Sequence, residues 1–209
     1  AGQALAAGLD ALTPNGEIEV EAVLATELSG FRLRPHMSDT LVVAVSQSGT
    51  TTDTNRTVDI VRNRGAKVIA IVNRRGSDLT DRADGVLYTS DGRDVEMSVA
   101  STKAFYSQIA AGMLLAIAIA DELLGDEGKA DRRGLLQGIN EMPAAMERVI
   151  ERRDVIGEAA RQFAPSRRYW ALVGNGPNRI AAQEVRIKLS ELCYNCLLYT
   201  SPSPRDIGE

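Results

Sequence analysis

Short apolar runs alternate with longer, half-polar segments along the first 125 residues of the chain. The runs at 41–45, 67–73 and 85–90 are continuous and rich in β-branched residues, which predicts buried strands of a parallel sheet. The segments 52–64 and 101–124 predict helices that follow the first and the third of these strands. Because strands and helices alternate with short links, the sequence predicts an α/β fold with a doubly wound parallel sheet flanked by helices.

The second part of the chain has a different pattern. Residues 126–165 are charged and helical in character, and glycines and Pro143 punctuate them, which predicts two helices that join two sheets. An apolar run with a glycine loop at 168–178, followed by a helix over 179–194, predicts that the strand-and-helix pattern begins again. The expected organisation is a first domain over 1–125, a helical linker over 126–165, the beginning of a second domain over 166–195 and a tail over 196–209.

The sequence at the two ends of the chain favours the interpretation that it is a piece of a longer protein. The last 14 residues, "CLLYTSPSPRDIGE", alternate Ser and Pro, which favours extended backbone and breaks the preceding helix. This string looks like translated sequencing adapter, so we expect residues 196–209 to be a non-native tail; a disordered native tail is the alternative. The chain begins with Ala1 and not Met, which favours a fragment whose true start is missing.

Composition and charge narrow the class of protein. The 209 residues are 44% hydrophobic and 4% aromatic, and 24 Lys and Arg are scattered among 28 Asp and Glu for a net charge of −4. This balance argues against nucleic acid as a partner. The longest apolar run, 109–120, is too short to span a bilayer, so we expect a helix buried in a core or subunit interface and no membrane partner. With two cysteines and no secretory signal at the start, the expected compartment is cytoplasmic.

Candidate chemistry gathers directly after the first predicted strand, in "LVVAVSQSGTTTDT", residues 41–54. The start of a helix at the carboxyl end of a parallel strand presents free N–H groups and favours an anion. Hydroxyl side chains add neutral donors, and Gly49 lets the backbone approach closely or take a positive φ. Because the loop has no Lys, a nucleotide P-loop is not indicated. The pattern predicts a site for a small phosphorylated metabolite; an ordinary Ser/Thr-rich loop with a helix cap is the alternative.

Three segments in order resemble one known family. "SQSGTTTDT" resembles the phosphosugar loop of sugar isomerase (SIS) domains, and "SVASTKAF" at 98–105 is similar to a motif in the isomerase half of the glutamine–fructose-6-phosphate aminotransferases. "EVRIKLSEL" at 184–192 resembles a helix in the second SIS domain of those enzymes. The resemblance covers roughly residues 20–195. It implies a flavodoxin-like SIS domain, whose first strand lies before Ala1, followed by the start of a second SIS domain.

The resemblance also implies roles for single residues. It implies that Ser46, Gln47, Ser48 and Thr51 bind the phosphate of fructose 6-phosphate, and that Val99 and Ser101 line the sugar site. Glu191 matches the acid that moves a proton between C1 and C2 of the sugar, and Lys188 matches a lysine that assists proton movement at the C1 hydroxyl. No cofactor and no metal are implied.

The spacing of the two proposed catalytic residues agrees with such a role. Lys188 and Glu191 are three residues apart on a predicted helix and share a face with Glu184. A proton shuttle through an enediol needs a carboxylate whose pKa is tuned by its surroundings. A surface ion pair on an amphipathic helix is the alternative.

The chain also departs from the family pattern. Thr50 stands where the family usually has Glu, and the single histidine, His36, is not at the ring-opening position and is expected in a surface loop. The imine-forming C-terminal lysine and the glutaminase domain are absent from the sequence. We therefore expect this chain to bind phosphosugar weakly and not to complete the reaction. Cys193 and Cys196 form a C-x-x-C pair without a second pair, so we expect Cys193 to be a core residue and no metal site.

The resulting hypothesis is the phosphosugar-binding isomerase region of a glutamine-dependent aminotransferase that makes glucosamine 6-phosphate. The predicted ligand is a hexose phosphate, and the intact protein is expected to form a homodimer through the apolar helix over 109–120. Two alternatives remain open. One is a phosphosugar-sensing SIS domain of a regulator, and the other is a different SIS enzyme such as a phosphosugar deaminase or deglycase.

Overall fold

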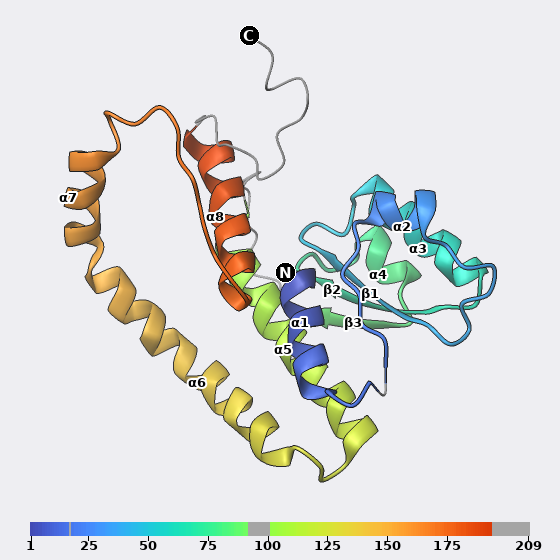
Figure 1. Ribbon diagram of the computed structural model, residues 1–209. Helices are drawn as coiled ribbons and strands as arrows, with labels where there is room; N and C mark the ends of the chain where they lie inside the picture. The colour runs from blue at the N-terminus through green and yellow to red at the C-terminus, as the bar shows by residue number, and fades with distance from the viewer. Residues whose placement is uncertain (17, 92–100, 194–209) are drawn as a thin grey trace. The chain divides into compact units, whose positions relative to one another are not determined.

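The computed structural model describes residues 1–16, 18–91 and 101–193, so Val99, Cys196 and the predicted tail over 196–209 lie outside the described residues (Figure 1). In chain order the elements are α1 (Gly2–Leu12), α2 (Ala25–Phe31), β1 (Leu41–Ser46), α3 (Thr52–Asn63), β2 (Lys67–Val72), α4 (Asp78–Arg82), β3 (Gly85–Tyr88), α5 (Lys103–Leu124), α6 (Lys129–Glu151), α7 (Arg153–Phe163) and α8 (Pro177–Cys193). The chain divides into two compact units, Ala1–Arg133 and Gly134–Glu209. The predicted domain limits at 125, 165 and 195 stay predictions.

The first unit is built on a parallel sheet with the strand order β1-β2-β3. β1 pairs with β2 from Leu41↔Lys67 to Ser46↔Val72, and the last pair between β2 and β3 is Val72↔Tyr88. The three strands fall where the apolar runs predicted them. Because the strands are parallel and in register at their ends, the segments that follow them leave the sheet at one common edge.

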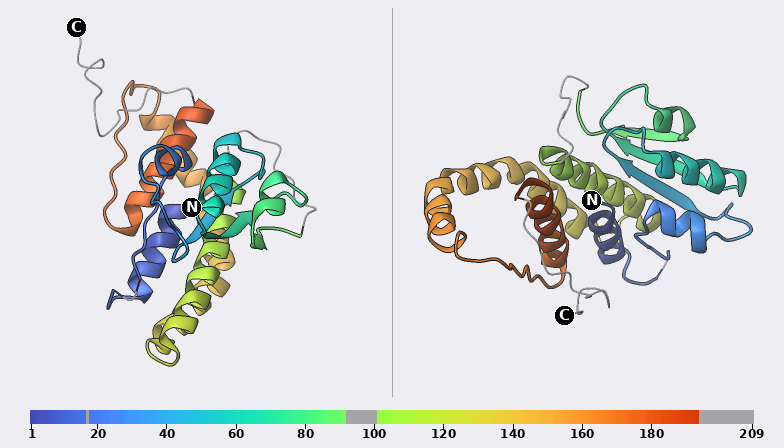
Figure 2. Two further views of the ribbon diagram at one scale, coloured as in Figure 1. Left: turned by 90° about the vertical axis from the view of Figure 1, so that its right-hand side faces the viewer. Right: turned by 90° about the horizontal axis from the view of Figure 1, so that it is seen from above.

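Helices cover both faces of this sheet, as Figure 2 shows. α3 and α4 pack on one face against β1 and β2, and α5 packs on the other face against β2, with α1 beside it. Two layers of helices around a parallel sheet confirm the predicted α/β architecture. The helix predicted over 52–64 is α3, and Gly65 follows its end with a φ of +96°, as the helix-stop pattern requires.

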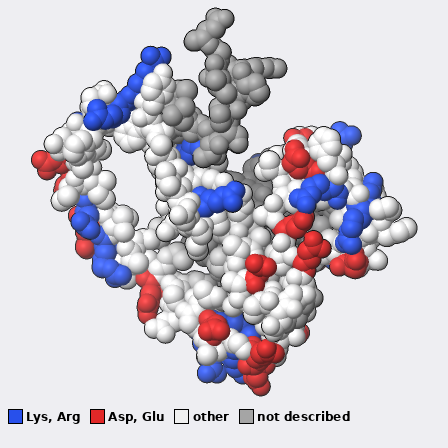
Figure 3. Space-filling model, in the orientation of Figure 1, with Lys and Arg blue, Asp and Glu red and all other residues white. Residues whose placement is uncertain are grey.

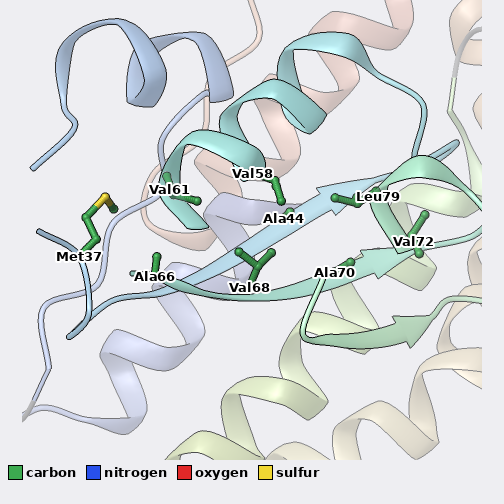
Figure 4. Close-up of a cluster of buried hydrophobic side chains, with 9 residues drawn as sticks. All are labelled: Met37, Ala44, Val58, Val61, Ala66, Val68, Ala70, Val72 and Leu79. Carbon is green, nitrogen blue, oxygen red and sulfur yellow. The ribbon is translucent and has the colours of Figure 1, made fainter. Parts of the chain in front are cut away.

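One hydrophobic cluster joins the sheet to α3 and α4 (Figure 4). Its members are Met37, Ala44, Val58, Val61, Ala66, Val68, Ala70, Val72 and Leu79. Val68, Ala70 and Val72 alternate along β2 and therefore lie on the same face of the strand. Val61 and Leu79 are completely buried, so α3 and α4 are anchored directly above the strands whose ends carry the candidate site.

α5 is the helix predicted over 101–124, and it extends beyond the apolar run at 109–120. It has 22 residues, and among the described helices it is the one long and apolar enough to cross a membrane, so the expectation that this segment is too short was wrong. Packing accounts for part of its apolar composition, because α5 packs along α1, and Ala116 and Ala120 are fully buried. A Cβ on Gly112 would lie 3.3 Å from the Cβ of Leu5, so an added side chain would require Leu5 to move by a few tenths of an ångström. We therefore interpret α5 as a core helix of the first unit.

The described part of the second unit is helical. The two helices predicted over 126–165 are α6 and α7, but Pro143 lies inside α6 and the break falls at Arg152 instead. The predicted helix over 179–194 is α8, which begins two residues earlier. The strand predicted at the start of 168–178 is not formed, and Trp170 makes only an isolated bridge. A parallel strand requires a neighbouring strand for its backbone hydrogen bonds, and the described second unit contains no sheet.

Charged side chains of both signs are interspersed on the face drawn in Figure 3. Around α3 and α4 several of them form ion pairs, such as Arg82 with Asp59 at 3.0 Å and Arg62 with Asp84 at 3.3 Å. His36 is exposed in the loop before β1, as expected for a surface histidine. Exposed pairs of this kind contribute little to stability, so the buried cluster is the main support of the fold.

Replacing Leu79 by Ala should therefore lower the free energy of unfolding of the first unit by about 2–5 kcal/mol, because it removes a fully buried side chain and leaves a cavity. Urea denaturation followed by circular dichroism measures this. The control is Leu24→Ala, where the side chain is 72% exposed and the change should stay within about 0.5 kcal/mol. Equal effects of the two substitutions would contradict the proposed core.

Candidate functional site

The loop between β1 and α3 makes a tight left-handed turn at Gly49. Gly49 is buried and has a φ of +67°, a conformation that strains other residues. A Cβ at this position would lie 2.1 Å from the Oγ of Ser77, which precedes α4. Glycine is required here both for the turn and for the close approach to Ser77.

Hydrogen bonds from three neighbouring segments hold the loop backbone. The carbonyl oxygen of Gly49 accepts from Asn55 Nδ2 at 3.2 Å and from the N–H of Leu79 at 3.0 Å. The carbonyl oxygen of Gln47 accepts from the N–H groups of Asn73 and Arg74 at 3.2 and 3.3 Å. The loop is thus fixed by its own helix, by α4 and by the end of β2.

Two predicted phosphate ligands, Ser46 and Ser48, take part in the turn through their side-chain oxygens. Ser46 Oγ is buried and accepts the N–H of Gly49 at 3.0 Å. Ser48 Oγ accepts the N–H of Thr50 at 3.2 Å and the hydroxyl of Thr50 at 2.9 Å. Since both serines act as acceptors within the loop, their own O–H groups can donate to another acceptor, such as a phosphate oxygen.

The start of α3 adds backbone donors to the same place. Thr51, a predicted ligand, precedes the first helical residue, and no side chain of the described residues caps the helix there. The first N–H groups of a helix have no partner within the helix, and the positive end of its dipole favours an anion. Asp53 is the one charged side chain between residues 46 and 55, and it is exposed in the first turn. The donors of this loop are therefore neutral.

Two other predicted ligands carry buried polar atoms without a partner among the described residues. These atoms are Gln47 Oε1 and Ser101 Oγ, and Asn55 Oδ1 and Ser77 Oγ share the property. Buried polar atoms are almost always hydrogen-bonded, so these four atoms are candidates for contact with a ligand or a water molecule. Gln47, Asn55 and Ser77 all belong to, or contact, the loop. Ser101 precedes α5 in the same unit, and Val99 lies outside the described residues.

The ends of the other two strands extend this polar edge. Asn73 follows β2, and its Oδ1 accepts from Thr89 Oγ1 at 3.3 Å and from Ser90 Oγ at 2.5 Å, both of which follow β3. Together with the bond from Asn73 N–H to Gln47, this connects the ends of all three strands. Sequence reasoning did not identify Asn55, Asn73 or Ser77. The one local signal was Ser77 between Gly76 and Asp78, a pattern typical of a helix start.

A separate shallow pocket of about 240 Å³ lies beside the loop between α3 and α4. It is lined by Thr50, Thr52, Asn55, Arg56, Asp59, Asp78 and Arg82. Arg82 pairs with Asp59 and Asp78, so two carboxylates offset the two guanidinium groups. This balance does not favour a phosphate, and Ser46 and Ser48 are not part of the lining.

The two predicted catalytic residues lie on α8, in the second unit. Lys188 Nζ contacts Glu191 Oε2 at 3.0 Å and Glu184 Oε1 at 3.2 Å, so the shared face predicted from the spacing is present. Partial burial acts to lower the pKa of Lys188, but the hydrogen bonds and charges of Glu191 and Glu184 outweigh it and raise the pKa above 10.5. Lys188 is therefore a cation at neutral pH and can donate a proton or a hydrogen bond, while the carboxylates are the available acceptors.

Comparison with known proteins identifies the family of the chain. The sequence profile of the SIS domain matches residues 11–118. The chain belongs to the SIS domain family. Glutamine–fructose-6-phosphate aminotransferase (isomerizing) of Corynebacterium efficiens is 41% identical over 179 residues, which are 85% of this chain and 28% of that protein. The enzyme of the same name from Mycobacterium tuberculosis is 40% identical over the same lengths.

Solved structures agree on the fold. The C-terminal domain of glucosamine-fructose-6-phosphate aminotransferase from Francisella tularensis superposes with a TM-score of 0.82 at 23% identity, over 94% of this chain and 53% of that chain. A phosphosugar isomerase structure from Salmonella typhimurium gives 0.73 at 18% identity, over 94% and 57%. The SIS-domain resemblance and the predicted fold class are thus confirmed. This chain spans less than a third of the length of the curated relatives it matches.

The close approach at Gly49 predicts unequal effects for two glycines with similar backbones. Gly49→Ala should destabilise the first unit more than Gly76→Ala. Gly76 also has a positive φ, +59°, but a Cβ added there would have no atom within 4 Å. Gly76→Ala should cost about 1–2 kcal/mol for the left-handed backbone alone. Chemical denaturation of both variants tests this; equal costs would contradict the steric contact with Ser77.

The raised pKa of Lys188 predicts a titration above pH 10.5 that depends on its two partners. Because the folded-state pKa is raised, the ion pairs stabilise the protein fully below pH 10.5, and this contribution is lost as the pH rises through the folded-state pKa. NMR titration of the Lys188 Cε signal measures the midpoint. In the variant Glu184→Gln/Glu191→Gln the midpoint should fall, because partial burial then acts without opposition. An unchanged midpoint would contradict the pairing.

Proposed function

We propose that this chain is the phosphosugar-binding isomerase region of a glutamine–fructose-6-phosphate aminotransferase, the activity named for its curated relatives. The observation that supports this most directly is the loop after β1. There, two serine hydroxyls, a left-handed glycine and the uncapped start of α3 gather in one turn. Neutral donors of this kind can bind a phosphate ester although the loop contains no lysine.

In this proposal Ser46, Gln47, Ser48 and Thr51 bind the phosphate of fructose 6-phosphate. The oxygen of Ser101 has no hydrogen-bond partner among the described residues, which favours a contact with the sugar. Val99 is proposed beside it from the motif alone. A serine oxygen can accept from a sugar hydroxyl as well as donate to it, which suits a polyol.

The proposed chemistry is the isomerisation of a ketose to an aldose through an enediol. A carboxylate must take a proton from C1 and return one to C2, and Glu191 is the proposed carrier. Lys188, held as a cation by its two glutamates, would donate a hydrogen bond to the oxygen that gains charge as the enediol forms. A regulator that only senses a phosphosugar has no need for such a group, so the Lys188–Glu191 contact favours an enzyme.

Other expectations from the sequence stay predictions. They are the homodimer, the cytoplasmic location, the absence of nucleic-acid and membrane partners, and the absence of a cofactor. Among the described residues no group of three or more His, Cys, Asp or Glu side chains is arranged to hold a metal ion. The stretch of α5 over 109–120, on which Leu114 is exposed, is the surface proposed for pairing with a second copy.

Ser48→Ala should weaken binding of fructose 6-phosphate to this chain by about ten- to hundredfold, because it removes a hydrogen bond to a charged group. Isothermal titration calorimetry measures the dissociation constant, and the rise in melting temperature with ligand should disappear in parallel. The control is Ser29→Ala, a partly buried serine in α2 away from the loop, which should bind like the wild type. Binding that is equal in all three proteins would overturn the proposed site, and so would no binding of any hexose phosphate.

A further inference from the structure

The two hydrogen bonds that Ser48 Oγ accepts come from one residue, Thr50. Its backbone N–H lies 3.2 Å from the serine oxygen and its hydroxyl oxygen 2.9 Å. A serine hydroxyl has two acceptor lone pairs and one proton. Since Thr50 occupies both acceptor positions, the O–H bond of Ser48 is directed away from Thr50.

The hydroxyl of Ser46 is less constrained. Among the described residues its oxygen accepts one hydrogen bond, from the N–H of Gly49 at 3.0 Å, which leaves a second acceptor position. A phosphate group accepts hydrogen bonds from the protein, so the useful state of either serine is the one in which it donates. Of the two hydroxyls, that of Ser48 is the one whose direction the loop determines more completely.

The backbone of the loop does not rely on the Thr50 side chain. Its shape is held by the bonds to the carbonyl oxygens of Gly49 and Gln47, which come from α3, α4 and the end of β2. Thr50 itself is exposed. The effect of its hydroxyl on Ser48 can therefore be separated from the folding of the loop.

We infer that Thr50 is a positioning residue, whose side chain holds the hydroxyl of Ser48 in the direction that donates to a bound phosphate. This inference rests on the proposed phosphosugar function. A hydroxyl that is fixed before the ligand arrives loses less rotational freedom on binding, which favours affinity. Thr50 acts through Ser48 in this arrangement.

The test is a double-mutant cycle on this chain with fructose 6-phosphate as the ligand and calorimetry as the readout. Thr50→Val keeps the shape and the backbone N–H but removes the donor, and should weaken binding about two- to tenfold. Thr50→Ser keeps the hydroxyl and should bind like the wild type. In the Ser48→Ala background, Thr50→Val should have no further effect. Without ligand, the wild type and the Thr50 variants should share one melting temperature.

Each result has a distinct meaning. If Ser48→Ala weakens binding while Thr50→Val does not, the phosphate site stands and the role of Thr50 is overturned. If the effects of Ser48→Ala and Thr50→Val add, Thr50 acts independently of Ser48, which also overturns it. If the wild-type chain does not bind fructose 6-phosphate, the proposed function fails, and this inference fails with it.

Discussion

The candidate site depends on the contact between Gly49 and Ser77. The left-handed turn at Gly49 brings the loop after β1 against Ser77, the residue that precedes α4, with no space for a Cβ between them. The same turn aims the Gly49 carbonyl at two donors, Asn55 and Leu79. Any side chain at residue 49 would displace the loop and, with it, the hydroxyls of Ser46 and Ser48. One backbone conformation thus supports the whole arrangement of donors.

The two sets of proposed functional residues use different electrostatics. The loop offers neutral hydroxyls and the start of a helix, which favour an anion without a fixed positive side chain. On α8, by contrast, Lys188 is held between two carboxylates, which keep it protonated. The first arrangement suits reversible binding of a phosphate ester, and the second suits proton transfer near a sugar carbon. The SIS-domain match at residues 11–118 includes the loop but does not extend to α8.

Local sequence patterns predicted the limits of elements that form from short-range information alone. The three strands, α3, α5 and α8 lie close to their predicted limits, because hydrophobic periodicity and glycine stops act over a few residues. Local patterns gave a wrong prediction where an element needs a neighbouring element to form. The apolar run at 168–173 does not become a strand, because the described second unit provides no neighbouring strand. Pro143 did not end its helix, and the break came at Arg152.

The sequence by itself determined the fold class, the loop of hydroxyls after the first strand and the shared face of Lys188 and Glu191, since each follows from spacing along the chain. Only the tertiary structure decided which groups fasten that loop. These groups belong to residues up to 30 positions beyond Gly49, namely Asn55, Asn73, Ser77 and Leu79. Helix packing and the parallel register of β1 with β2 bring Asn73 to Gln47 and the other three to Gly49. Such contacts depend on how elements stack in space, and the pattern of any one segment does not contain that information.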